Sequence, residues 1–136
     1  MNYYFDTSIW MDFFENRDEP HLPKGELAHK LMTHIAKNND KIICSDFVVA
    51  ELRLADYPLF EIEGLFEKLN HIIIWVESTE KQIRKAKDLS AKRGIPKKDA
   101  AHALIARDNK AVLITLDRHF QRLLDIVKVR RPQDII

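Results

Sequence analysis

Along the chain, short continuous apolar runs alternate with longer segments in which apolar residues recur every three or four positions. The short runs are rich in β-branched and aromatic residues and predict buried strands at 2–6, 41–44, 71–76 and 111–116, with a last strand at 126–129. The longer segments predict helices, the clearest at 8–15, 27–38, 59–69 and 80–93. Strands that alternate with helices indicate an α/β fold: a central parallel sheet of four to five strands flanked by helices on both faces (α/β/α).

Residues that start or stop helices support this division of the chain. Two prolines and a glycine make residues 18–25 a loop. Ser45 or Asp46 can cap a helix that follows the second strand. A capping-box pattern at Thr79 precedes the most basic helix, and Pro96 can start the next one.

The composition is that of a single globular domain spanning residues 1–136. Hydrophobic residues make up 46% of the chain and charged residues 32%, which suits one core and argues against disorder. No apolar run is long enough to cross a bilayer, and no basic stretch followed by an apolar segment marks a signal peptide. The one cysteine, Cys44, gives no disulfide framework and fits a reducing interior, so we expect a cytoplasmic protein without membrane contacts.

Four acidic residues stand beside or inside apolar segments: Asp6, Glu51, Asp99 and Asp117. Asp6 and Asp117 directly follow predicted strands, and ligands of open α/β sheets bind beyond the carboxyl ends of the strands. Burying an ionised carboxylate is costly unless something pairs with it. Acids that meet from distant parts of the chain therefore indicate a divalent cation between them, and oxygen ligands alone select Mg²⁺ or Mn²⁺.

Three of these acids also have a structural explanation. Aspartate is a preferred helix N-cap, so Asp117, judged alone, is explained as well by capping as by catalysis. For Asp6, the hydroxyls of Thr7 and Ser8 could cap the helix instead, which would leave the Asp6 carboxylate free. Asp99 would interact favourably with the dipole at the start of its helix.

Glu51 is the acid that structure alone explains least well. Its neighbours are almost all apolar, and Arg53, two residues on, does not share its helix face. Metal coordination, direct or through water, explains Glu51 better.

His102, three residues after Asp99, could orient the Asp99 carboxylate, contact the substrate or simply pack. The other histidines show no ligand spacing: His21, His29, His34, His71 and His119.

Charge is distributed unevenly, although the net charge is only +1. Residues 44–80 contain eight acidic and two basic residues, whereas residues 81–98 contain eight basic residues and one acidic residue. A basic segment next to an acidic site suits a polyanion whose phosphate must reach a bound metal. Taken alone, the segment is explained more simply as a solvated helix face. The three glycines leave no Gly-rich phosphate loop.

Four segments together resemble the PIN-domain family and, within it, the VapC-like ribonuclease toxins of bacterial and archaeal toxin–antitoxin pairs. These segments are Phe5–Phe14, Val49–Leu52, Ile95–Ala103 and Thr115–Phe120. Each is weak alone, but their order and separations cover essentially the whole chain. The resemblance implies a single PIN-like domain that cleaves RNA, usually as a homodimer, with a small cognate antitoxin covering the site. One departure is the loop at 20–25, which could change contacts with a partner.

The resemblance also implies that the four acids converge on one or two Mg²⁺ or Mn²⁺ ions. We expect Asp6 and Asp99 to be the principal ligands and Asp117 to complete a second site. Glu51 would ligate through water or orient the nucleophile. The side chains of Thr7, Thr115 and His102 would support the acids. Basic residues would hold the RNA backbone: Lys97, Lys98, Arg118, Arg84 and Lys85.

Three other functions stay open on the sequence alone: a nuclease of RNA maturation with the same fold, a phosphatase, and a non-catalytic binding module. A phosphatase of the aspartyl-phosphate type needs a second acid two residues after the first, where this chain has Ser8. A binding module would use apolar residues outside the core stripes, such as Phe13, Phe60 and Leu65.

Overall fold

The computed structural model describes residues 1–136 and contains one five-stranded sheet in the order β3-β2-β1-β4-β5. Every neighbouring pair of strands is parallel. The strands are β1 (Asn2–Phe5), β2 (Lys41–Ser45), β3 (Ile73–Val76), β4 (Ala111–Ile114) and β5 (Val129–Arg130). The predicted α/β architecture with a parallel central sheet is therefore confirmed.

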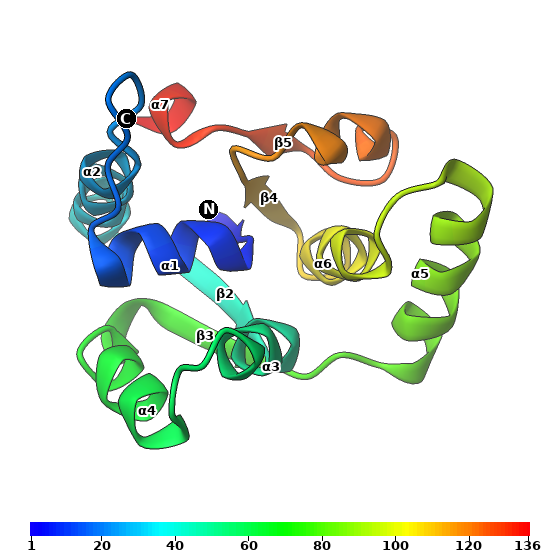
Figure 1. Cartoon of the computed structure of the whole chain (residues 1–136), viewed down its shortest axis with the longest axis horizontal. Coiled ribbons are helices and arrows are strands. Elements are labelled where there is room, and N and C mark those ends of the chain that lie inside the picture. Colours follow the sequence, from blue (N-terminus) through cyan, green and yellow to red (C-terminus); the bar gives the residue numbers. More distant parts are fainter.

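Helices fill the connections between the strands. They are α1 (Thr7–Glu15), α2 (Lys24–Lys37), α3 (Asp46–Leu54), α4 (Leu59–Glu67), α5 (Glu80–Arg93), α6 (Lys97–Asp108) and α7 (Pro132–Ile135), with short 3₁₀ segments η1 (Asn70–Ile72) and η2 (Arg118–Leu123). The α1–α2 pair and the α5–α6 pair lie on opposite sides of the sheet (Figure 1). Both faces of the inner strands are thus covered, which explains why these strands are continuous apolar runs rather than alternating ones.

The order of the strands places the crevice of the sheet between β1 and β4. The chain runs from β1 outward to β2 and β3, then crosses back through α5 and α6 to β4 on the other side of β1. Strand order reverses at this point, and open α/β sheets bind ligands beyond the carboxyl ends of the strands at such a reversal. Asp6 follows β1 and Asp117 lies three residues after the end of β4, so both come to this crevice.

Several predicted boundaries are wrong by a few residues. The loop predicted at 18–25 ends early, because α2 begins at Lys24 and includes Gly25. A Cβ on Gly25 would lie 2.5 Å from the backbone carbonyl carbon of Asn16, so glycine lets α2 start against the preceding loop. The last strand is Val129–Arg130 rather than 126–129.

The predicted caps are partly correct. The capping box of Thr79 with Gln82 is present, and α5 covers the residues predicted for it. Ser45 occupies the N-cap position of α3, but its side chain makes no capping hydrogen bond. Asp46 does not cap the helix either and accepts hydrogen bonds from the backbone N–H and the hydroxyl of Ser78.

No helix combines the length and the apolar character that crossing a bilayer requires.

Candidate metal-binding active site

Asp6 is held at the junction of β1 and α1. It is 5% exposed, and one carboxylate oxygen accepts a hydrogen bond from the backbone N–H of Ile9 at 3.1 Å, which makes Asp6 the N-cap of α1. The expectation that Thr7 or Ser8 would cap this helix in its place is wrong. The other oxygen accepts a hydrogen bond from the Thr115 hydroxyl. Burial raises the pKa of Asp6 to about 6, against the opposing effect of both hydrogen bonds.

Thr115 joins the acids that follow β1 and β4. Strands β1 and β4 pair in parallel, with Phe5 opposite Ile114, so the residues after them lie side by side. The Thr115 hydroxyl donates to Asp6 and accepts the backbone N–H of Asp117 at 2.9 Å. One hydroxyl therefore fixes the spacing between two of the four acids.

Asp117 both caps η2 and reaches toward Asp99. Its Oδ1 accepts the backbone N–H of His119 at 2.9 Å, and its side chain is 42% exposed. Asp99, in the first turn of α6, is only 4% exposed. Burial and the negative charge of Asp117 raise the pKa of Asp99. Oxygens of Asp99 and Asp117 and a ring nitrogen of His119 lie within 4.8 Å of one another.

Glu51 comes to the site from α3 and is held by His102 of α6. Nε2 of His102 forms a hydrogen bond with Glu51 Oε1, and Nδ1 lies 2.5 Å from the Tyr4 hydroxyl, which contacts Ser45 Oγ at 2.7 Å. Both ring nitrogens of the buried His102 are thus taken by Glu51 and Tyr4, so His102 hydrogen-bonds Glu51 rather than Asp99, the acid on its own helix. Burial alone would raise the pKa of Glu51, but the hydrogen bond and charge of His102, with smaller effects, hold it below its ordinary value.

Thr7 and Asp99 each leave a buried polar atom without a partner. Thr7 lies next to Glu51, yet its Oγ1 is buried and makes no hydrogen bond of normal geometry. Asp99 Oδ2 is likewise buried and unbonded. Native proteins leave few such atoms, and a bound ion or water is the usual explanation.

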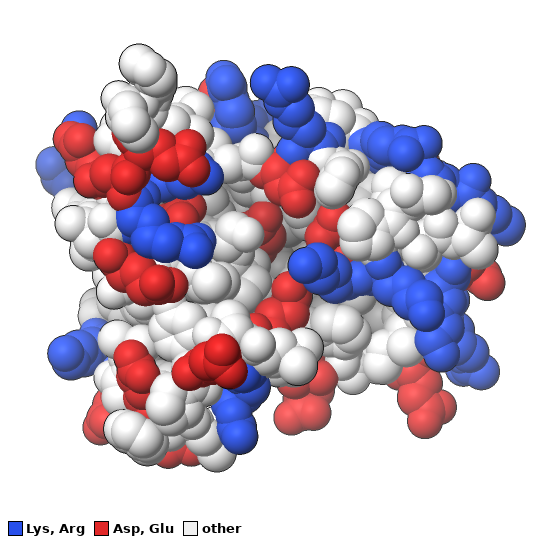
Figure 2. All heavy atoms as spheres, in the orientation of Figure 1, with Lys and Arg blue, Asp and Glu red and all other residues white.

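The basic residues divide into two groups. Lys98 lies close enough to Glu51 and Asp99 for its charge to lower the pKa of both. Lys97 and Arg118 are exposed near the same acids in the sequence. In contrast, Arg84 and Lys85 line a separate hollow of about 760 Å³ between α5 and α6, together with other charged and polar residues: Thr79, Lys81, Gln82, Asp88, Arg107 and Asp108. Figure 2 shows acidic side chains along the central hollow and basic side chains over the α5 side.

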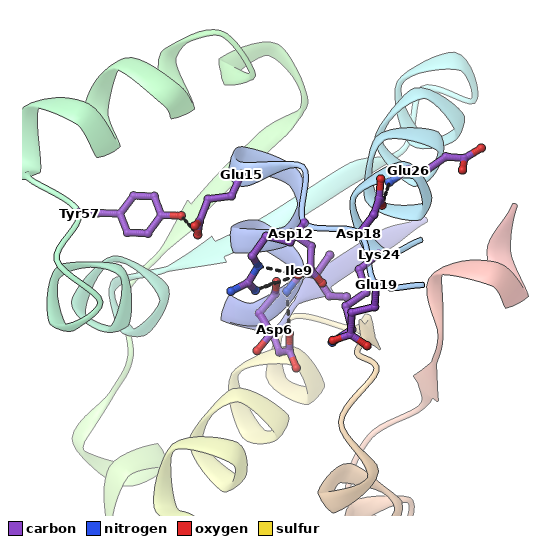
Figure 3. Close-up of polar contacts among 11 residues, drawn as sticks. Asp6, Ile9, Asp12, Glu15, Asp18, Glu19, Lys24, Glu26 and Tyr57 are labelled. Carbon is purple, nitrogen blue, oxygen red and sulfur yellow. Dashed lines mark hydrogen bonds and ion pairs between the residues drawn. The ribbon is translucent and has the colours of Figure 1, made fainter. Parts of the chain in front are cut away.

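A second hollow next to Asp117 is not predicted by the sequence. It measures about 300 Å³ and is lined by residues of α1, the loop after it, the start of α2 and the segment after β4: Ser8, Asp12, Arg17, Glu19, Lys24, Leu116 and Asp117. Asp12 is 2% exposed and accepts a hydrogen bond from Arg17 Nε at 3.0 Å, so the guanidinium of Arg17 balances the charge of this acid. Figure 3 shows Asp6 and Asp12 along α1, with Glu19 and Lys24 beside them. The signal available was the position of Asp12 inside the apolar α1 segment.

The model of the PIN domain family matches residues 3–125, nearly the whole chain. The chain belongs to the PIN domain family. No curated protein matches it. Among solved structures, this PIN domain is similar to VapBC-1 from nontypeable Haemophilus influenzae, with 23% identity, a TM-score of 0.69 and coverage of 98% of this chain and 99% of that one.

Two further structures show the same fold. VapBC2 from Rickettsia felis, bound to a DNA fragment from its promoter, has 18% identity and a TM-score of 0.67 over 96% of this chain and 98% of that one. FitAcB from Neisseria gonorrhoeae has 20% identity and a TM-score of 0.63 over 98% of this chain and 99% of that one.

The donor set of this PIN domain fits a hard divalent cation. Four carboxylates arrive from separate elements, and none of them forms a salt bridge with a lysine or arginine. Asp99 Oδ2 is buried and accepts no hydrogen bond, so it has a lone pair available for a cation. Such oxygens are the ligands that Mg²⁺ and Mn²⁺ prefer.

Proposed function

We propose that this PIN domain is a metal-dependent endoribonuclease and acts as the toxin of a toxin–antitoxin pair. Its four acids would hold one or two Mg²⁺ or Mn²⁺ ions: Asp6, Glu51, Asp99 and Asp117. The observation that supports the proposal is the cluster of Asp99 and Asp117 with His119, to which the Thr115 hydroxyl ties Asp6, without a lysine or arginine in a salt bridge with any of the four acids. Asp6 and Asp99, the two buried acids of the four, would destabilise the fold when ionised unless a cation compensated them.

When bound, a divalent ion lowers the pKa of a water molecule and stabilises charge on the phosphate. The chain holds the ligands for that chemistry in place. The N–H of Ile9 and the hydroxyl of Thr115 orient both oxygens of Asp6. His102 occupies one oxygen of Glu51, which leaves the other oxygen to face the substrate or a bound water. Ligands fixed in this way bind metal more tightly than mobile ones.

Basic side chains would bind the RNA backbone on either side of the acids. Lys98 would bind beside the acids, because its charge lowers the pKa of both Glu51 and Asp99. Lys97 and Arg118 would extend this contact, and Arg84 and Lys85 would bind phosphates farther along the strand. Contacts of this kind are independent of sequence and weaken as salt rises.

The similar structures support an antitoxin partner. Two of them are of VapBC, and another is a toxin–antitoxin complex from Klebsiella pneumoniae. We infer a small antitoxin that covers the acidic site, a homodimeric toxin and an RNA substrate. The buried thiol of Cys44 supports a reducing, cytoplasmic location.

The test measures RNA cleavage and growth inhibition together. Purified protein should cleave a labelled RNA in Mg²⁺ or Mn²⁺ and lose this activity in excess EDTA. Asp6→Asn should be inactive while remaining folded, and Asp56→Asn, at an exposed aspartate after α3, should keep full activity. Undiminished cleavage by Asp6→Asn, or in EDTA, would contradict the proposal.

Induction in a bacterial host separates a toxin from other PIN proteins. The wild type should stop growth and Asp6→Asn should not. Cleavage in vitro without growth inhibition would favour an RNA-maturation nuclease. Growth inhibition that survives the loss of Asp6 would favour a binding module.

A further inference from the structure

We infer that His119 is a metal ligand, which together with Asp99 and Asp117 forms a mixed nitrogen and oxygen position that prefers Mn²⁺ over Mg²⁺. This inference rests on the proposed function, because it assumes that the acidic site binds a divalent ion. His119 is not one of the four acids, so it would be an additional ligand. Its side chain would also determine which metal this protein prefers.

The geometry of the three side chains fits a single ion. Nδ1 of His119 lies 3.3 Å from Asp117 Oδ1 and 3.5 Å from Asp99 Oδ2. Ligand bonds of roughly 2.0–2.2 Å place neighbouring ligand atoms roughly 2.9–3.5 Å apart around tetrahedral or octahedral ions. Both spacings from the His119 nitrogen are therefore those of atoms sharing an ion, with Nε2 left to carry the ring proton, and the ligand atoms of Asp99 and Asp117 lie within 4.8 Å of each other.

The unbonded oxygen of Asp99 gives independent support. Asp99 is 4% exposed, and its Oδ2 is the buried atom that has no hydrogen-bond partner. This same oxygen is the one that faces His119 Nδ1. The contact thus does not satisfy the carboxylate by a hydrogen bond, and a cation between the two atoms would satisfy it.

The local fold holds the His119 backbone in place without using its imidazole. The backbone N–H of His119 donates to Asp117 Oδ1, and Thr115 fixes the N–H of Asp117 in turn. Phe120, the next residue, is fully buried and anchors η2 in the core. The imidazole is 59% exposed, so its removal would disturb neither the cap nor the core.

The rival explanation is an ion pair in which a protonated His119 neutralises the two acids. The two explanations differ in what they predict for metal binding. A histidine ligand should favour transition ions, because imidazole suits them and Mg²⁺ prefers oxygen. A positively charged histidine would oppose both ions equally, since it competes with any cation for the same carboxylates.

The experiment compares Mn²⁺ and Mg²⁺ binding to the metal-free full chain by calorimetry in wild type, His119→Ala and the control His71→Ala. His71 is an exposed histidine on the amino-terminal side of β3, away from the acids. Pulsed electron paramagnetic resonance of bound Mn²⁺ provides a second readout, because a directly bound imidazole nitrogen gives a characteristic modulation. We expect His119→Ala to bind Mn²⁺ at least about tenfold more weakly, with a much smaller change for Mg²⁺.

The nitrogen modulation should disappear in His119→Ala and persist in His71→Ala. Unchanged Mn²⁺ affinity, or tighter binding of both ions in His119→Ala, would overturn the inference. If Asp6→Asn abolished Mn²⁺ binding in that case, the proposed function would still stand. A wild-type protein that bound neither ion would instead contradict the proposed function itself.

Discussion

Asp6→Asn is expected to stabilise the metal-free protein at neutral pH, although it removes the central acid of the site. Asp6 is buried and has no lysine or arginine partner, and its pKa rises from 3.8 to about 6. Between pH 4 and 6, the Asp6 carboxyl group is therefore mostly protonated in the folded protein but mostly ionised in the unfolded chain. The unfolding free energy should therefore fall as pH rises from 4 through 6.

The size of the effect follows from the shift. A shift from 3.8 to about 6, at 1.36 kcal/mol per pH unit, corresponds to about 3 kcal/mol at pH 7.5. Asparagine keeps an oxygen that can accept the N–H of Ile9, so the cap on α1 should survive. For a domain of this size, about 3 kcal/mol corresponds to a rise in Tm of roughly 10 °C.

The assay is thermal unfolding in EDTA between pH 4 and 8, with Asp88→Asn as the control. The Tm difference between Asp6→Asn and wild type should be small at pH 4 and grow through pH 6, whereas the control should show no such trend. Added Mn²⁺ should raise the Tm of the wild type alone and reduce the difference. A Tm difference that did not change with pH, or a mutant less stable than wild type at pH 7.5, would refute the reasoning.

Other substitutions test the supports of the site. His102→Gln should lower stability by about 1–3 kcal/mol and cleavage by at least about tenfold beyond what its folded fraction explains; cleavage that only tracks the folded fraction would argue against a positioning role. Thr115→Val should weaken Mn²⁺ binding roughly 10- to 100-fold, because Asp6 loses its donor; calorimetry tests this, and unchanged affinity would contradict it. Gly25→Ala should cost about 1–3 kcal/mol in urea unfolding, since its Cβ meets the preceding loop, whereas Gly64→Ala has open space and should not destabilise.

The topology and the strand-end acids follow closely from the sequence. Alternating apolar runs and helical segments predict a parallel sheet, and such a sheet brings Asp6 and Asp117 to one edge whatever the loop details are. Glu51 is predicted as a site residue because a glutamate in an apolar segment needs a partner. These inferences rest on periodicity and on the cost of burying charge, both of which are local properties of the chain.

Contacts between different helices and strands could not be predicted from the sequence. Helical spacing relates His102 to Asp99 on the same helix, but it says nothing of the neighbouring helix, whose Glu51 is the actual partner. His119 is an exposed residue of a 3₁₀ segment, and only the folded chain shows it beside two acids. Asp12 forms a salt bridge with Arg17, which lies in the loop after α1, and the sequence pattern does not predict this pair.

The most direct test of the central claim is a crystal structure of the protein with Mn²⁺, with the ion located by its anomalous scattering. We expect an anomalous peak at the carboxyl ends of β1 and β4, with carboxylate oxygens of Asp6 and Asp99 at roughly 2.0–2.3 Å or one water away. An ion bound elsewhere, or carboxylates that turn out to be paired with lysines or arginines and bind no ion at millimolar Mn²⁺, would contradict it.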